Sequence, residues 1–240
     1  MMNRNVKIAM ELVRLAKSLV AENLVADKDG DYSDFTGKID LGGNASQAEV
    51  ENATFTVKGT KILWKDGVFK SGLMMGADWE KGTMEKGAQF SGKWKNGINK
   101  GGDFLDGIWE DGVWKNGRFE GGTWEKGTWE DGMFSSQNAH CWKDGVWKNG
   151  RFEGKDWEDG LFEGGEFKAG SFRGGAFKGG KFVGKEDGGE AIWIDGAFKG
   201  GDFLGSTWFG GKWEGGEWFG GKDGKYKKWH GRDDSPDKWS

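Results

Sequence analysis

The sequence predicts an all-β fold, a three-sided β-solenoid of about ten 15-residue coils with an N-terminal amphipathic α-helix. Three observations carry the solenoid prediction. A five-residue unit, Gly-x-Trp/Phe-x-x, recurs between Trp64 and Trp218. The central residues of these units group in threes, so the full repeat is about 15 residues long. The two breaks in the five-residue phase fall at the same point within a group of three.

The grouping in threes is visible in the identity of the central residues. Nine of the ten first members are Trp: Trp64, Trp79, Trp94, Trp109, Trp124, Trp142, Trp157, Phe172, Trp193 and Trp208. The third members are Phe without exception from Phe104 to Phe203. Grouping by four mixes Trp with Phe, Met, Gln and Asn, which favours three pentads per coil.

The breaks in phase separate a third member from the next first member. Phe134 is followed by Trp142, and Phe182 is followed by Trp193, where a regular step would be five residues. Insertions at one corner are what a stack of coils tolerates, because the strands resume their register afterwards. We therefore expect two loops to leave the same corner of the solenoid.

Strand geometry explains the residues around each centre. Side chains alternate between the two faces of a strand, so the aromatic centre points inward and its two neighbours point outward. Dipeptides such as Asp111-Gly112 and Asn116-Gly117 indicate turns that need positive φ. A flat meander of hairpins is the alternative. It would expose its Trp side chains on one open face, and it would not explain why the central residues group in threes.

The pentads resemble those of the pentapeptide-repeat class of β-solenoids. The likeness lies in the inward residue at each centre and the small residue two positions before it, over residues 61–221. The chain departs from that class in using Trp and Gly instead of Leu and Ala, and in having three pentads per coil where the family has four. The resemblance implies a type of fold and no activity.

The first 22 residues predict an amphipathic helix. Its apolar side is built from Ile8, Leu12, Leu15 and Leu19, with charged residues on the other side. The helix could cap the solenoid, since an open end exposes strand edges, or it could dock on a partner. The segment is similar to short leaders of tailed-phage structural proteins, and Val20-Ala21-Glu22 resembles the sites cut by phage maturation proteases.

Three further regions complete the predicted organisation. Residues 23–60 are expected to form a transition and N-terminal cap, in which residues 53–57 and then 61–64 lead as strands into the first coil. Residues 61–221 form the solenoid, roughly 48 Å long at about 4.8 Å per coil. Residues 222–240 are expected to form a C-terminal cap or tail, with Tyr226, Trp229 and Trp239 folded over the last coil.

Composition narrows the class of protein. The net charge is −4 with both signs interleaved, which disfavours a nucleic-acid binder and a strongly acidic mimic. The single Cys excludes an internal disulfide framework. No apolar run is long enough to span a membrane, and the N-terminus lacks a signal-peptide pattern. We expect synthesis in a cytoplasm and a final location in a virion or extracellular assembly.

Two groups of residues could carry chemistry. Asp27, Asp29, Asp31 and Asp34 surround Gly30, which favours a solvated acidic turn over a calcium loop because the EF-hand spacing is not met. His140 and Cys141 lie in the first insertion, where a metal ligand or nucleophile would need partners that the sequence does not offer. We therefore predict no catalytic, cofactor-binding or metal-binding residue.

The outer faces carry the candidate interface. The residue before each second-member centre is apolar or Thr in nine of ten coils, although it should point outward. The candidate interface residues in this row are Val68, Ile98, Val113, Val146 and Leu161, together with Ile8, Leu12, Leu15 and Leu19 of the helix. β-propensity alone could explain the row. The alternative is a surface covered by the N-terminal helix or by a partner.

These observations predict a non-enzymatic structural rod that meets protein partners or copies of itself in a particle or filament. A decoration, spacer or fibre element of a phage-like virion fits this description. A binding module is the alternative, either an adhesin or an inhibitor of a DNA-handling enzyme, as in some pentapeptide-repeat proteins. The mixed Lys and Glu rows disfavour a DNA mimic, which would carry a dense acidic face.

Overall fold

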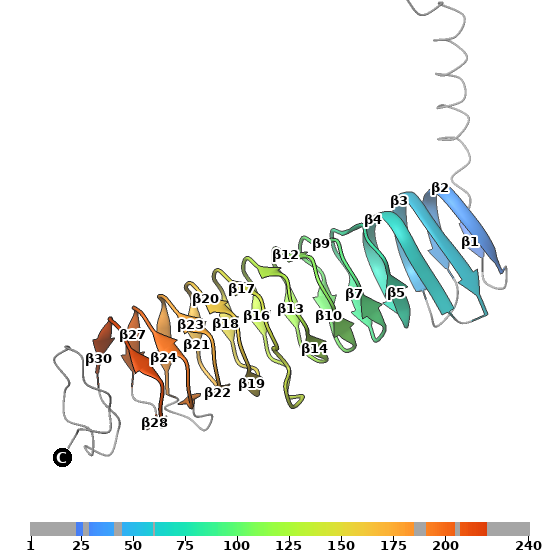
Figure 1. Cartoon of the computed structure of the whole chain (residues 1–240). Helices are drawn as coiled ribbons and strands as arrows, with labels where there is room; N and C mark the ends of the chain where they lie inside the picture. The colour runs from blue at the N-terminus through green and yellow to red at the C-terminus, as the bar shows by residue number, and fades with distance from the viewer. Residues whose placement is uncertain are drawn as a thin grey trace, which may run out of the picture.

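In the computed structural model, the chain forms a straight rod of stacked coils (Figure 1). The structure describes residues 23–25, 29–40, 45–59, 61–184, 191–204 and 207–219. Within these ranges every regular element is a β-strand, and the coils pair in parallel, so the predicted β-solenoid is confirmed. The helix predicted for residues 1–22 and the cap predicted for residues 222–240 lie outside the described residues.

The N-terminal end is an antiparallel sheet that covers the first coil. Strand β3 (Ala45–Lys58) pairs antiparallel with both β2 (Gly30–Asp40) and β4 (Lys61–Met75), and short β1 (Asn23–Val25) adds to β2 in parallel. Strand β4 is itself the first coil, because it also pairs in parallel with the second coil. The antiparallel strands thus hide the core of the first coil from solvent, and Phe55 is 1% exposed.

Each later coil contributes one short strand to each of three faces, except that the coil of Trp142 holds only isolated bridges on the first face. The first face holds β5 (Ala77–Trp79), β8 (Lys93–Trp94), β11 (Ile108–Trp109), β14 (Thr123–Trp124), β19 (Asp156–Trp157), β22 (Gly170–Phe172), β25 (Ala191–Trp193) and β28 (Thr207–Trp208). The second face holds β6 (Thr83–Met84), β9 (Ile98–Asn99), β12 (Val113–Trp114), β15 (Thr128–Trp129), β17 (Val146–Trp147), β20 (Leu161–Phe162), β23 (Ala176–Phe177), β26 (Ala197–Phe198) and β29 (Lys212–Trp213). The third face holds β7 (Ala88–Phe90), β10 (Asp103–Phe104), β13 (Arg118–Phe119), β16 (Met133–Phe134), β18 (Arg151–Phe152), β21 (Glu166–Phe167), β24 (Lys181–Val183), β27 (Asp202–Leu204) and β30 (Glu217–Trp218).

The register settles the number of sides. Trp109 pairs in parallel with Trp94 and with Trp124, so one turn of the solenoid holds 15 residues. Backbone hydrogen bonds join successive coils, as when Lys95 N–H donates to the Trp79 carbonyl at 2.8 Å. A four-sided coil would have placed Trp129 beside Trp109, and a hairpin meander would have given antiparallel pairs, so both alternatives are wrong.

The first insertion leaves the stack intact. Residues 135–141 separate Phe134 from Trp142, yet Trp142 bridges in parallel to Trp124 on one side and Trp157 on the other. After the second insertion, Trp193 pairs with Phe172 in the same way. Both insertions therefore leave the corner between the third and first faces, as the sequence predicted.

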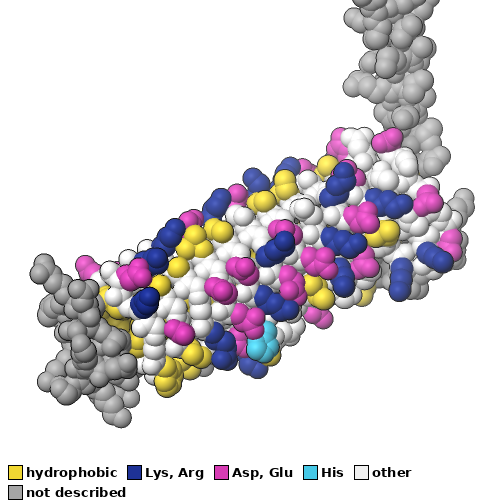
Figure 2. Space-filling view, in the orientation of Figure 1, with side chains coloured by type: hydrophobic (Ala, Val, Ile, Leu, Met, Phe, Trp, Pro, Cys, Tyr) yellow, Lys and Arg dark blue, Asp and Glu magenta, His cyan; other side chains and the backbone are white. Residues whose placement is uncertain are grey.

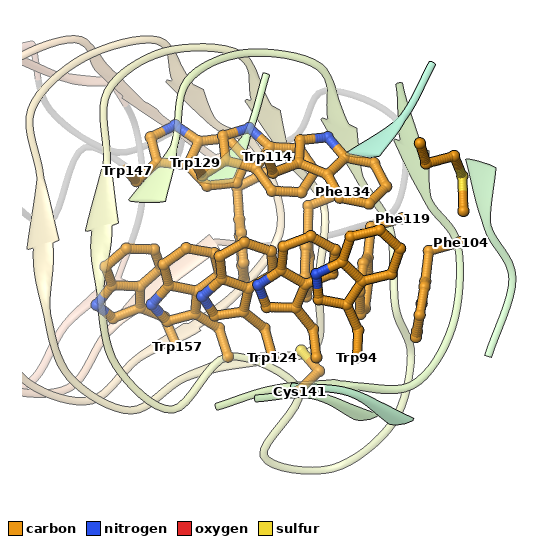
Figure 3. Close-up of a cluster of buried hydrophobic side chains, with 14 of the residues drawn as sticks. Trp94, Phe104, Trp114, Phe119, Trp124, Trp129, Phe134, Cys141, Trp147 and Trp157 are labelled. Atoms are coloured by element: carbon orange, nitrogen blue, oxygen red, sulfur yellow. The ribbon is translucent and has the colours of Figure 1, made fainter. Parts of the chain in front are cut away.

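Three columns of stacked rings fill the interior (Figure 3). In the first column, the centroids of Trp109 and Trp124 are 5.0 Å apart and their planes differ by 5°. Rings from different columns meet edge to face within a coil, as Trp109 and Trp114 do at 5.5 Å. The indole N–H groups of the first-column Trp residues from Trp64 to Trp157 have no hydrogen-bond acceptor in the described part of the chain. Ring contact and burial, not hydrogen bonding, therefore hold this column.

Glycine corners make room for the rings. A Cβ atom on Gly82 would lie 2.9 Å from Trp64 Nε1 and 2.7 Å from the Gly67 carbonyl oxygen of the preceding coil. The residue before many corner glycines closes the turn, since Asp111 Oδ1 accepts the Gly112 N–H at 2.7 Å. Backbone approach and ring size together thus require glycine two positions before the next centre.

Two polar residues replace rings in the N-terminal third of the core. Asn99 occupies the second column, where its side-chain amide donates to the Gly102 carbonyl at 3.0 Å and its Oδ1 accepts the Gly102 N–H at 2.9 Å. Gln89 occupies the third column and donates to the Ala77 carbonyl at 3.1 Å. Both are buried, so the second and third ring columns are continuous only beyond these coils, whereas the first column is unbroken from Trp64 onward.

Candidate functional site

The second face gathers the predicted interface residues of the solenoid into one row. Successive parallel pairs join Val68 to Thr83, Ile98, Val113, Thr128, Val146 and Leu161 in that order. Ala176, Ala197 and Lys212 continue the row to the far end. Every member except Lys212 is half-buried. We call this line the apolar row; the helix residues Ile8, Leu12, Leu15 and Leu19 lie outside the described residues.

The other two faces lack such a row within the described coils. The equivalent positions on the first face include Asp78, Lys93 and Asp156, and those on the third include Asp103 and Arg118. Figure 2 shows hydrophobic side chains in a broken line along the rod, among Lys, Arg, Asp and Glu side chains. The continuous apolar row is therefore a property of one face and not of solenoid strands in general.

A charged row runs beside the apolar row on the same face. It consists of the residues after the second-member centres: Lys70, Glu85, Lys100, Lys115, Glu130, Lys148, Glu163, Lys178, Lys199 and Glu214. Lys100 Nζ lies 3.1 Å from Glu85 Oε1, and Glu130 lies 3.7 Å from the ammonium groups of both Lys115 and Lys148. These side chains remain at least one third exposed, so each pair contributes little stability, about 0.2–1 kcal/mol.

The charged row continues onto the N-terminal sheet. Lys70 Nζ lies 2.7 Å from Glu51 on β3. This hydrogen bond raises the pKa of Lys70. On the third face, Asp103 holds Arg118 at 2.8 Å in a similar contact between coils. Charges on the rod are thus mostly neutralised by the coil above or below.

A second cluster of charged residues lies beside the first insertion. Asp156 is 4% exposed, and its Oδ1 accepts from Arg173 Nη2 at 2.9 Å and Nε at 3.0 Å. Its Oδ2 accepts the His140 N–H at 3.3 Å, and His140 Nδ1 contacts Glu158. Sequence reasoning found His140 but missed Asp156, Arg173 and Glu158. These contacts tie the loop to the coil of Trp157, and Arg173 links that coil to the coil of Phe172, which is a structural role.

We expect Asp156→Asn to lower the free energy of unfolding by about 1–3 kcal/mol, because it weakens charge-assisted hydrogen bonds to a buried acceptor. Chemical denaturation measures this loss. Asp159→Asn is the matched control, because Asp159 is exposed and only accepts the Gly160 N–H at 2.7 Å. At an equivalent corner, Asn116 Oδ1 accepts the Gly117 N–H. An Asn at position 159 should therefore keep the corner hydrogen bond, and the control should be neutral. Equal effects of the two substitutions would contradict the assigned role.

Cys141 is buried beneath the same loop. Its thiol donates to the Asp156 carbonyl at 3.1 Å, and burial raises its pKa. The thiol therefore stays protonated at neutral pH and is no nucleophile. The pKa of Cys141 is higher in the folded chain than in the unfolded chain. The protonated thiol therefore contributes to stability below the unfolded pKa of about 8.5, and this contribution is lost as pH rises through the folded pKa.

We expect Cys141 in the folded protein to resist an aromatic disulfide reagent at pH 8. The reagent should react fully once denaturant unfolds the chain, and absorbance of the released thiolate measures both rates. The chain has one Cys, so the signal has a single origin. Equal rates with and without denaturant would show that the thiol is open to solvent.

The turn predicted around Gly30 is wrong, because Asp31 and Asp34 lie within strand β2 of the N-terminal sheet. Asp29 Oδ1 accepts the Gly59 N–H at 2.7 Å, and Asp31 accepts from the Thr56 hydroxyl. The Thr56 hydrogen bond and Lys65 lower the pKa of Asp31. Asp34 adopts a φ of 53° at the register shift of β2 between Tyr32 and Phe35, and Asp27 lies outside the described residues. Within the described ranges, no three His, Cys, Asp or Glu side chains are placed to share a metal ion.

A shallow open hollow lies on the first face. It is lined by Lys93, Ile108, Glu110, Glu125, Lys126 and Asp144. Its charged groups are engaged with neighbours, since Lys93 Nζ lies 3.7 Å from Glu110 and Lys143 Nζ lies 2.8 Å from Glu125. The hollow therefore offers no converging free groups for chemistry.

Comparisons with known proteins add no family. No family model, no curated protein and no solved structure matches the chain. The regular parallel coils and ring columns are compatible with a pentapeptide-repeat-like fold, with three pentads per turn. Among the described residues there is no helix with the length and apolar character needed to cross a membrane.

Proposed function

We propose that this chain is a non-enzymatic structural rod in a larger assembly, such as a decoration, spacer or fibre element of a phage-like particle. The observation that supports it is the ring core, which runs from Trp64 to Trp218 along the solenoid. A stiff, continuously packed rod holds two points at a fixed distance. The paired charges along its faces give no converging acid, base or nucleophile.

The phage-like setting is supported by the leader resemblance at Val20-Ala21-Glu22 alone. The alternative, a binding module, draws support from the apolar row on the second face. Mixed-sign ion pairs such as Lys100 with Glu85 argue against an inhibitor that imitates the charge of DNA. A structural rod with one contact face accounts for both the core and the row.

Density-gradient fractionation of particles from the native host tests the proposal. The full chain, followed by mass spectrometry, should sediment with the particles at a fixed ratio to their major protein. A host cytoplasmic enzyme serves as the control for contamination and should stay at the top of the gradient. Recovery of the chain only in the soluble fraction would contradict the structural role.

A further inference from the structure

We propose that the second face binds a second copy of this chain, packed face to face and antiparallel. The two-fold axis would pass between the coil of Thr128 and that of Val146, which are neighbours in the row. The inference rests on the proposed structural role, because it names a partner that the rod would contact in its assembly.

Symmetry restricts how two such faces can meet. Each second face carries two parallel lines, the apolar row and the charged row, on opposite edges of the same short strands. A two-fold axis perpendicular to the rod and within the interface places apolar row on apolar row and charged row on charged row. A two-fold axis along the rod would place charges on apolar side chains, which leaves them desolvated and unpaired. The antiparallel arrangement is therefore the one that suits this face.

The order of charges suits the antiparallel register. With the axis between Thr128 and Val146, four of the five facing pairs join opposite charges across the interface: Glu130 with Lys148, Lys115 with Glu163, Glu85 with Lys199, and Lys70 with Glu214. Lys100 meets Lys178 of the second copy as the one like-charged pair. Each pair occurs twice because of the symmetry.

Neighbouring registers are much poorer. A slip of one coil that places Lys148 opposite its own copy puts like charges together at every position, for example Glu130 opposite Glu163. A slip of one coil the other way places Glu130 opposite its own copy and joins opposite charges in only two of its five facing pairs. Like charges facing each other disfavour these two neighbouring registers. A slip of two coils, with the axis between Lys148 and Glu163, joins opposite charges in three of its four facing pairs, but it leaves two coils of each copy uncovered. The register centred between Thr128 and Val146 therefore has the largest number of opposite-charge pairs.

The apolar row is complementary in the same register. Ile98 would face Ala176 and Thr83 would face Ala197, so larger side chains meet small ones. Val113 would face Leu161 at the centre, beside Thr128 on Val146. These half-buried side chains would lose their remaining exposure, which supplies the favourable apolar term.

The size of the face sets the strength of the contact. Ten coils at about 4.8 Å, each presenting roughly 10 Å of strand, give about 500 Å² per copy. Two copies would bury roughly 1,000 Å², below the standard interface of about 1,600 Å². We therefore expect a weak dimer that dissociates on dilution and at high salt, where the charged pairs are screened.

Disulfide trapping in the full chain tests the register. Val113→Cys and Leu161→Cys are prepared separately, mixed at equal concentration and oxidised. The antiparallel register brings Val113 of one copy onto Leu161 of the other, so the mixture should give a cross-linked heterodimer. Each variant alone should stay monomeric under denaturing electrophoresis, because identical residues lie about three coils, or roughly 14 Å, apart, beyond disulfide reach. Cys141 is buried and present in both samples.

A charge swap gives a second readout. By sedimentation velocity at low salt, Glu130→Lys and Lys148→Glu should each weaken the dimer by about tenfold or more, because each introduces like-charged contacts. The double variant should restore affinity to near the original. Circular dichroism of each variant checks folding, and exposed charges of this kind should leave it unchanged.

Three outcomes would overturn the dimer. These are a monomer at millimolar concentration, cross-linking of either single variant to itself as fast as the mixture, and no recovery in the charge swap. Occupation of the face by residues 1–22 of the same chain would give the first of these. If the chain is monomeric but sediments with particles, the dimer proposal fails and the structural role stands. If the chain forms the dimer but is absent from particles, the structural role fails and the dimer proposal stands.

Discussion

Trp114→Ala should lower the free energy of unfolding by about 3–5 kcal/mol, the range for removing a large ring from a packed core. Trp114 is 1% exposed and stacks on Trp129 at 5.0 Å. It also meets Trp109 and Phe119 edge to face. The coil on its other side offers the small Asn99 in that column, so no ring can move in to fill the cavity.

Chemical denaturation followed by far-UV circular dichroism measures the loss. Trp114→Phe should cost much less, because Phe162 occupies the same column two coils after Trp129 and stacks on Trp147 at 5.7 Å. Lys115→Ala, an exposed neighbour, should stay within about 0.5 kcal/mol of the original chain. A loss below about 1 kcal/mol for Trp114→Ala would mean that the rings do not carry the stability.

Gly117→Ala should be about as damaging, at roughly 3 kcal/mol or more, from backbone strain together with steric overlap. Gly117 has a φ of 117°, and an added Cβ would lie 2.1 Å from the Gly102 carbonyl oxygen in the preceding coil. That oxygen belongs to the backbone of the stack, so relief would require two coils to separate. The hydrogen bond from Met133 N–H to the Gly117 carbonyl, at 2.9 Å, would be strained as well.

Gly59→Ala isolates the part of this effect that comes from conformation alone. Gly59 has a φ of 56°, but nothing lies within 4 Å of an added Cβ. Its substitution should therefore cost only the left-handed penalty of about 1–2 kcal/mol. Thermal melts of both variants give the comparison. Similar losses at the two positions would show that contact between coils does not determine where glycine is needed.

The coil could be predicted because its geometry repeats in the sequence. The Trp residues from Trp64 to Trp157 recur at the spacing at which they stack, and Asp-Gly or Asn-Gly pairs mark the corners. The alternating Lys and Glu of the second face repeat at the same spacing, and in the structure they pair between coils, as Lys100 and Glu85 do. Local pattern and tertiary contact coincide in a solenoid, because each coil touches only its neighbours.

The N-terminal sheet and the loop cluster could not be predicted in the same way. Strands β2 and β3 lack the pentad. No sequence pattern in residues 30–58 predicts that these strands pair antiparallel and contain bulges. Asp156 precedes Trp157 as an ordinary outward residue, and its burial arises because the loop of residues 135–141 folds over it. Contacts that depend on one insertion have no counterpart in other coils, so the repeat pattern of the sequence cannot predict them.

The first ring column also has an optical consequence. From Trp64 to Trp157, seven indoles lie in sequence with adjacent centroids 4.5–5.0 Å apart. At such separations the electronic transitions of neighbouring chromophores couple, so an excitation is shared along the column and does not belong to one residue. Far-ultraviolet circular dichroism, where the intense indole transition lies, should then contain an exciton signal that depends on the order of the whole stack. The rod thus carries an intrinsic spectroscopic reporter of its own integrity, with no label attached.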